Sequence, residues 1–285
     1  MSGPQSAAGG AFFVDGIAFW APTLPGWEHA RAAFRGEAAP LEVAAQRPAP
    51  ELLAAAERRR APDTVALALE VAAAAVRESG CAADALPSIF TSAHGDLAVN
   101  DYMCSTLASQ PTLISPTRFH NSVHNAAAGY WTIATGCREA STAVSAFDAS
   151  FGAGLLEAAS QCSADARPVL LVAFDVEATG ALAGVTQSTG LLACALVVAP
   201  EASRRSIAAF DWTLADDPVG APAARSAAAQ SLAGNAMSGA LPLLEAIATM
   251  PSSGDDSDVL ALPLAPSLAL RLVPRALPPA KTTLR

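Results

Sequence analysis

The segment at 167–174, RPVLLVAF, constrains the fold more than any other part of the sequence. After its first residue it is apolar without interruption, and polar and apolar positions do not alternate. A strand with one solvated face alternates, whereas a continuous apolar strand is typical of a sheet that is covered on both faces. Helices must then pack on both sides. The segment therefore predicts an α/β layered domain with a mostly buried mixed sheet.

Strand and helix patterns alternate along the rest of the chain, which supports this fold class. The clearest helix spans 63–79, where Pro62 stands at the entry, Asp63 can cap the first turn and Gly80 ends the helix. Two prolines in the apolar segment 260–273 favour an edge strand or hairpin there. The other predicted elements are helices at 117–135, 149–161 and 235–249, and strands at 11–20, 87–92, 141–147, 192–198 and 206–212.

Length and composition predict one large domain with a small appendage. The 285 residues are 52% hydrophobic and only 15% charged, so a sizeable core can form and disorder is excluded. We place the main domain at 1–213. Residues 214–285 form a short C-terminal extension, a helix plus an edge strand, packed on the same domain.

The charge excludes a nucleic-acid-binding surface, since the net charge is −9 and the pI is near 4.9. The one basic cluster, Arg58 to Arg60, is interpreted as the solvated end of a helix. No stretch reaches the length of a membrane span, and no secretory signal precedes the first strand. We expect a cytoplasmic protein that does not bind membranes.

Neither the cysteines nor the histidines predict a metal site. The five cysteines are scattered without a C-x-x-C pair, and we interpret them as buried free thiols. His120 and His124 are four residues apart and would share one face of the helix predicted there. Asn121 stands where a metalloprotease has its glutamate, and no histidine follows His124. We therefore expect no metal and no cofactor.

The run SPTRFHNSVHNAAAGYWTIATGCREASTAVSAFDASFGAGLLEAA at 115–159 resembles the part of β-ketoacyl synthases that leads to the catalytic cysteine. Asn125 to Gly129 matches a loop that starts a helix, Ala140 and Ser141 match the start of the next strand, and Ala149 starts the helix after the nucleophile. Weaker likenesses extend this to about residues 10–212. The resemblance implies the N-terminal half of a thiolase-like fold, and it is nearest to short "chain length factor" types of aryl-polyene and related pigment pathways.

The departures from the family are chemically decisive. The match places Asp148 where the family has its nucleophilic cysteine, and a carboxylate is a poor acyl acceptor. The family's two catalytic histidines belong to a C-terminal half that is largely missing here. The resemblance therefore implies a non-condensing partner subunit that binds an active ketosynthase, an acyl-carrier protein or both.

An alternative function remains, namely a small acyltransferase or hydrolase that uses Asp148 with His124, and more weakly His120, for acid–base catalysis. Against it, Asp148 at a strand–helix turn is more simply the N-cap of the helix from Ala149. Candidate pocket residues are Asn125, Phe147, Asp148 and Phe151, although Asn125 is expected chiefly to satisfy backbone groups in a buried turn.

The resemblance also implies a dimer, formed either by two copies of the chain or with a ketosynthase. In the thiolase family, the strand entering the nucleophile turn pairs antiparallel with its copy across the dimer axis. The matching strand here is 141–147, with Thr142, Val144 and Ala146 on one face. Proline at Val144 is expected to remove a hydrogen-bond donor from that edge and to dissociate the dimer.

Overall fold

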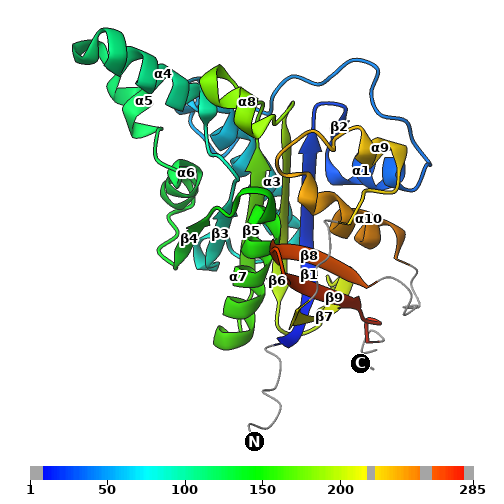
Figure 1. Cartoon of the computed structure of the whole chain (residues 1–285). Coiled ribbons are helices and arrows are strands. Elements are labelled where there is room, and N and C mark those ends of the chain that lie inside the picture. Colours follow the sequence, from blue (N-terminus) through cyan, green and yellow to red (C-terminus); the bar gives the residue numbers. More distant parts are fainter. Residues whose placement is uncertain (1–8, 217–221, 251–258, 279–285) are drawn as a thin grey trace, which may run out of the picture.

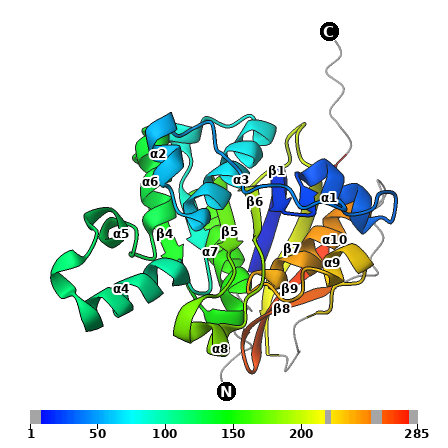
Figure 2. The same cartoon turned by 90° about the horizontal axis from the view of Figure 1, so that it is seen from above.

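The computed structural model describes residues 9–216, 222–250 and 259–278, which form one nine-stranded mixed sheet with helices on both faces (Figure 1, Figure 2). The order across the sheet is β4-β3-β5-β6-β1-β7-β9-β8, and β2 pairs with the end of β1. The predicted α/β architecture with a mostly buried mixed sheet is confirmed.

The strands are β1 (Gly9–Ala21), β2 (Leu24–Pro25), β3 (Ser88–Thr91), β4 (Ser141–Val144), β5 (Val169–Asp175), β6 (Leu192–Ala199), β7 (Ala208–Ala215), β8 (Leu260–Ala265) and β9 (Leu268–Pro274). The α-helices are α1 (Trp27–Phe34), α2 (Ala55–Arg60), α3 (Asp63–Ser79), α4 (Leu97–Ser109), α5 (Pro116–His120), α6 (Ala126–Thr135), α7 (Ser150–Asp165), α8 (Ala183–Thr186), α9 (Ala227–Gln230) and α10 (Leu241–Thr249). Short 3₁₀ turns include η2 (Pro111–Leu113), η3 (Phe147–Ala149) and η5 (Ser238–Ala240).

Strand β5 is buried along its whole length, as its continuous apolar run predicts. Leu171 and Ala173 belong to a core cluster with α1, α7 and α10, whereas Leu170 and Val172 belong to a second cluster with α3 and α6. The two clusters lie on opposite faces of the sheet, so β5 is the strand around which both helix layers pack.

Helix α3 has the predicted bounds, and Gly80 ends it in the left-handed conformation with φ 70°. The predicted capping role of Asp63 is wrong, because Pro62 holds the N-cap position. Asp63 is instead the first helical residue, and its Oδ1 lies 2.7 Å from Nη1 of Arg47. The basic cluster Arg58 to Arg60 does form the solvent-facing end of α2, which buries no residue.

The prediction of one continuous helix at 117–135 is wrong. The chain forms α5, then a turn, then α6. The Ser122 hydroxyl donates to the Phe119 carbonyl at 2.8 Å, so a side chain takes an acceptor that a continuing helix would use. The polar residues Asn121, Ser122 and Asn125 favour such side-chain bonds over a further helical turn.

The C-terminal part joins the same sheet. Helix α10 begins at Leu241, later than predicted, and the predicted hairpin is formed by β8 and β9. Strand β9 pairs with β7, and Leu244, Leu262 and Leu270 belong to the core cluster around α7. None of the described helices is long and apolar enough to cross a membrane.

Candidate functional site

Three neighbouring strands end at one edge of the sheet. Strand β3 pairs in parallel with both β4 and β5, so their carboxyl ends lie together. This is where ligand sites usually form in open α/β sheets. The chain continues from β3 into the turn that contains His94, from β4 into η3 and α7, and from β5 at Asp175.

Asp175 organises the turn after β3. Its carboxylate is buried and accepts hydrogen bonds from Ser92 Oγ at 2.7 Å and from the Ala93 N–H at 2.8 Å. The same Ser92 hydroxyl oxygen accepts the Gly95 N–H at 2.8 Å. Burial raises the pKa of Asp175, and the hydrogen bonds from Ser92 and Ala93 oppose part of that rise. The carboxylate thus fixes the backbone on which His94 is carried.

The turn between β4 and α7 is a sharp elbow with Phe147 at its bend. Phe147 has φ 52°, a left-handed conformation that is strained for a residue with a large side chain. Ser150 holds the elbow: its hydroxyl donates to the Phe147 carbonyl at 2.6 Å and accepts the Ala146 N–H at 3.0 Å. The Phe147 ring is half exposed and lies 5.3 Å from the His94 ring.

Helix α7 begins directly after this elbow, and a small residue in it allows close packing against β3. A Cβ on Gly154 would lie 2.8 Å from Cγ2 of Thr91, which is closer than real Cβ contacts come. Thr91 Oγ1 in turn donates to the Ser150 carbonyl at 2.9 Å. The backbone at the bend is therefore set by packing between β3 and α7.

Asp148 follows the bend and is exposed within η3. Its predicted role as the N-cap is wrong, because Ala149 holds the N-cap position of α7 without any side-chain hydrogen bond. His124 Nε2 lies 3.0 Å from the Ser92 carbonyl oxygen, which accepts a hydrogen bond from the ring N–H. No hydrogen bond or ion pair joins Asp148 to His124 within the described residues.

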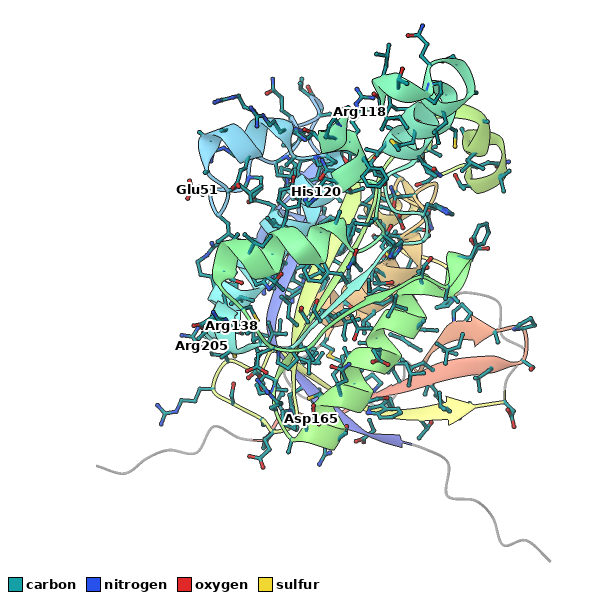
Figure 3. The ribbon with its side chains drawn as sticks, turned by 90° about the vertical axis from the view of Figure 1, so that its left-hand side faces the viewer. Glu51, Arg118, His120, Arg138, Asp165 and Arg205 are labelled. Carbon is teal, nitrogen blue, oxygen red and sulfur yellow. The ribbon has the colours of Figure 1, made fainter. Side chains whose placement is uncertain are left out.

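The prediction that His120 and His124 share one helix face is wrong, because helix α5 ends at His120. His120 ends α5 (Figure 3), and its ring lies 6.2 Å from the Tyr130 ring. His124 lies in the following turn. Asn125 is exposed at the N-cap of α6 and makes no capping bond, so its expected burial is also wrong. Phe151 is buried in the core cluster around α7.

The cysteines supply no nucleophile near the elbow. Burial raises the pKa of both Cys162 and Cys194 to about 12, so both remain neutral thiols at physiological pH. All five cysteines are free, and Cys104 is exposed, which corrects the expectation that all are buried.

The sequence interpretation missed Asp175 and Ser92, which were assigned only as parts of strands or strand ends. The available signal was a carboxylate placed directly after a continuous apolar strand. A carboxylate at the end of a buried strand needs hydrogen-bond donors, so it indicates a polar network there. Ser145 was also missed; its hydroxyl donates to the Ala93 carbonyl at 2.9 Å and ties the elbow strand to the turn after β3.

Strand β4 lies at one end of the sheet (Figure 1), and of the described strands it pairs only with β3. The carbonyls of Ala140 and Val144 accept from the N–H groups of Ser88 and Ser92, at 3.0 and 3.3 Å. Because backbone groups alternate along a strand, the groups of Thr142 also face β3 and those of Ser141 and Ala143 face outward.

This alternation corrects one expectation from the sequence. The Val144 N–H points toward β3, so proline at Val144 would disturb the sheet of this chain and not its open edge. The strand itself ends at Val144, three residues before the predicted end. The side chains of Thr142, Val144 and Ala146 are half-buried, and those between them are exposed.

A family model for the β-ketoacyl synthase N-terminal domain matches residues 31–254. No curated protein matches the sequence. Among solved structures, a chain in the complex of the ketosynthase ApeO with its chain length factor ApeC from Xenorhabdus doucetiae has a TM-score of 0.69 and 22% identity, covering 92% of this chain and 99% of that chain.

Two further structures show the same fold at lower identity. A chain of the ishigamide ketosynthase/chain length factor has a TM-score of 0.68 and 15% identity, and the match covers 94% of this chain and 100% of that chain. A ketosynthase from module 1 of the bacillaene synthase of Bacillus amyloliquefaciens has a TM-score of 0.53 and 14% identity, and only 48% of its length is covered. The fold thus corresponds to about half of that modular ketosynthase.

Proposed function

Because this chain belongs to the β-ketoacyl synthase N-terminal domain family and has the thiolase-like fold, we propose that it is a non-condensing partner subunit of a ketosynthase. The observation that carries the proposal is the elbow between β4 and α7, where Phe147 occupies the bend. The pathway we propose is fatty-acid-like or polyketide-like, of the aryl-polyene type.

A condensing enzyme needs a nucleophile at this bend, and neither residue there can serve. The phenyl ring of Phe147 has no lone pair to attack a thioester. The Asp148 carboxylate would give a mixed anhydride, which water hydrolyses readily. We infer that the position matching the family's cysteine is Phe147 or Asp148, and that both leave the chain without a covalent acyl intermediate.

The histidines near the elbow also fail to replace the family's pair. No histidine follows His124 in the sequence, and His124 lies against the Ser92 carbonyl. The His94 ring faces the Phe147 ring. His94 lies near enough to Asp175 to lower the pKa of that carboxyl. Neither ring, however, is hydrogen-bonded or ion-paired to a carboxylate among the described residues, which argues against the alternative acid–base enzyme.

We propose that the ketosynthase docks on the open edge of β4. The outward backbone groups of Ser141 and Ala143 can extend the sheet into a partner strand, as sheet edges commonly do. Large apolar side chains are also exposed on the elements beside this edge, namely Val123, Ile133 and Phe147. A surface of this kind is typical of an interface.

The second proposed partner is an acyl-carrier protein. Support comes from a solved structure of a type II polyketide synthase acyl-carrier protein in complex with its ketosynthase, AntDE:AntF. One of its chains resembles this chain with a TM-score of 0.72 at 11% identity. In our proposal the carrier protein presents the growing chain to the ketosynthase, and this subunit shapes the space that receives it.

The first experiment tests condensation directly. Purified protein is incubated with acyl- and malonyl-carrier protein, alone and with a candidate ketosynthase from the native host, and ketoacyl products are measured by mass spectrometry. We expect product only when the ketosynthase is present. Turnover by the lone chain that Asp148→Asn abolishes would contradict the proposal and favour the acyltransferase or hydrolase.

A second experiment locates the nucleophile position. In a Cys104→Ser background, Phe147→Cys and Asp148→Cys are treated with a ketosynthase-directed epoxide inhibitor. The bend at Phe147 predicts faster labelling of the thiol at 147, and condensation by neither variant. Faster labelling at 148 would instead assign the nucleophile position to Asp148.

A further inference from the structure

Strand β1 has an unpaired stretch in the middle of the sheet. Strand β7 pairs with residues from Gly9 to Val14, and β2 pairs with Trp20 and Ala21. Between these two, β6 is the only neighbouring strand among the described residues, and it lies on the opposite side of β1. One edge of β1 is therefore open over residues 15–19, a length of about 16 Å at the usual rise per residue.

The orientation of the open groups follows from the pairing on either side. The Ile207 N–H donates to the Val14 carbonyl at 2.8 Å, so Val14 faces β7. Backbone groups alternate between the two edges of β1, and the bulge between Val14 and Gly16 shifts this alternation by one residue. After the bulge, the backbone groups of Ala21 therefore face β2. The N–H and C=O groups of Ile17 and Phe19 therefore point into the gap. No hydrogen bond from another described residue fills it.

A cavity of about 850 Å³ lies along this gap. Helix α1 and the end of α10 border it on one side, and α3 borders it on the other. Trp27, Arg35 and Met250 line the first side, and Glu70 and Ala74 line the second. An inserted strand would alternately present side chains to these two walls.

Several of the charged side chains that line the cavity are bonded already. Arg31 pairs with Glu28 at 2.8 Å, Arg35 donates to the Ala248 carbonyl, and Arg205 donates to the Glu78 carbonyl at 2.9 Å. Glu70 is half-buried and has no hydrogen-bond or ion-pair partner among the described residues. Burial raises the pKa of its carboxyl, which nearby Arg77 partly offsets.

We propose that this cavity binds an extended peptide segment of a partner protein, which adds a strand to β1 between β2 and β7 and places a lysine or arginine against Glu70. The free main-chain groups of Ile17 and Phe19 can pair with the main chain of an extended peptide, whereas the hydrocarbon of an acyl chain offers no donors or acceptors. The cation would pair with the Glu70 carboxylate, which Arg77 influences without forming an ion pair among the described residues.

This site is separate from the proposed ketosynthase edge, since β3, β5 and β6 lie between β4 and β1. It does not depend on the proposed function. Each of the two proposals can fail while the other stands.

The first test measures amide hydrogen exchange of the ligand-free protein by NMR. We expect Ile17 and Phe19 to exchange at least about 100-fold faster than Ala18, whose amide faces β6. Equal protection of the three amides would overturn the open edge.

The second test selects binders from a displayed library of random octapeptides on immobilised full-length protein. We expect enriched peptides to carry a basic residue and to protect the Ile17 and Phe19 amides. Ala74→Phe should reduce their affinity at least tenfold by filling the α3 side, and Glu70→Gln about tenfold. Glu57→Gln on α2 is the matched control and should change nothing. Failure to enrich peptides, or binding unaffected by Ala74→Phe, would overturn the proposal.

Discussion

The orientation of backbone groups in β4 allows the proposed interface to be separated from the stability of the fold. Proline removes one N–H, and neighbouring residues of a strand point their N–H groups to opposite sides. At Ala143 the lost donor faces outward, whereas at Val144 it faces β3. Two adjacent substitutions with the same chemistry are therefore expected to have opposite effects.

The magnitudes follow from the number of bonds lost. In a two-fold symmetric dimer, Ala143→Pro removes one donor from each chain, so two hydrogen bonds are lost. At a net 0.5–1.5 kcal/mol for each, association weakens by about 1–3 kcal/mol, or roughly 5- to 150-fold in Kd. With a ketosynthase as partner only one bond is lost, and the effect is roughly 2- to 12-fold.

Stability should respond in the opposite way. Ala143→Pro breaks no bond within the chain, so we expect its melting temperature to stay within about 2 °C of wild type. Val144→Pro breaks the β3 ladder and should cost about 1–3 kcal/mol, which lowers the melting temperature by several degrees.

The assay is multi-angle light scattering over a concentration series, with and without a candidate ketosynthase from the native host, combined with thermal unfolding. A wild type that remains monomeric in both cases would refute the interface. An Ala143→Pro variant that associates as strongly as wild type would refute the pairing through this edge.

Four further predictions concern stability and thiol chemistry. Asp175→Ala should destabilise the fold by about 2–4 kcal/mol in denaturant unfolding, because the buried Ser92 hydroxyl and Ala93 N–H lose their acceptor, whereas Asp175→Asn should cost less. Since burial raises the folded-state pKa of Asp175, its stabilising contribution is complete below about pH 4 and falls as pH rises, so the advantage of wild type over Asp175→Asn should shrink toward pH 8. A thiol reagent at pH 8 should modify exposed Cys104 quickly and leave Cys162, with its pKa of about 12, unmodified until the protein unfolds. A chain truncated after residue 213 should be insoluble, because it exposes core surface that α10 and the β8–β9 hairpin cover.

The elements that could be predicted from the sequence are those with local determinants. The apolar run of β5 implies cover on both faces, and Pro62 and Gly80 mark the ends of α3 through their own backbone preferences. The break between α5 and α6 was missed because it depends on one side-chain bond, from Ser122 to the Phe119 carbonyl. Apolar periodicity carries no information about such a bond.

The bend at Phe147 could not be predicted for a different reason. Neither glycine nor asparagine stands there, so no residue in the turn prefers a positive φ by itself. The conformation is imposed by Ser150, which bonds on both sides of the bend, and by the close packing of Gly154 on Thr91. Only the tertiary structure brings these residues together.

The two ends of the sheet also differ in a way that favours β4 as the partner edge. At the other end, β8 carries Pro263, and its register with β9 shifts between Pro263 and Ala265. Proline and irregular register are ordinary means of preventing edge-to-edge pairing. Strand β4 has neither: it contains no proline, no charged residue and no register shift, and Ser141 and Ala143 present small side chains outward. The blocked edge at β8 and the open edge at β4 therefore favour the proposed association through β4, and the paired proline variants test that edge directly.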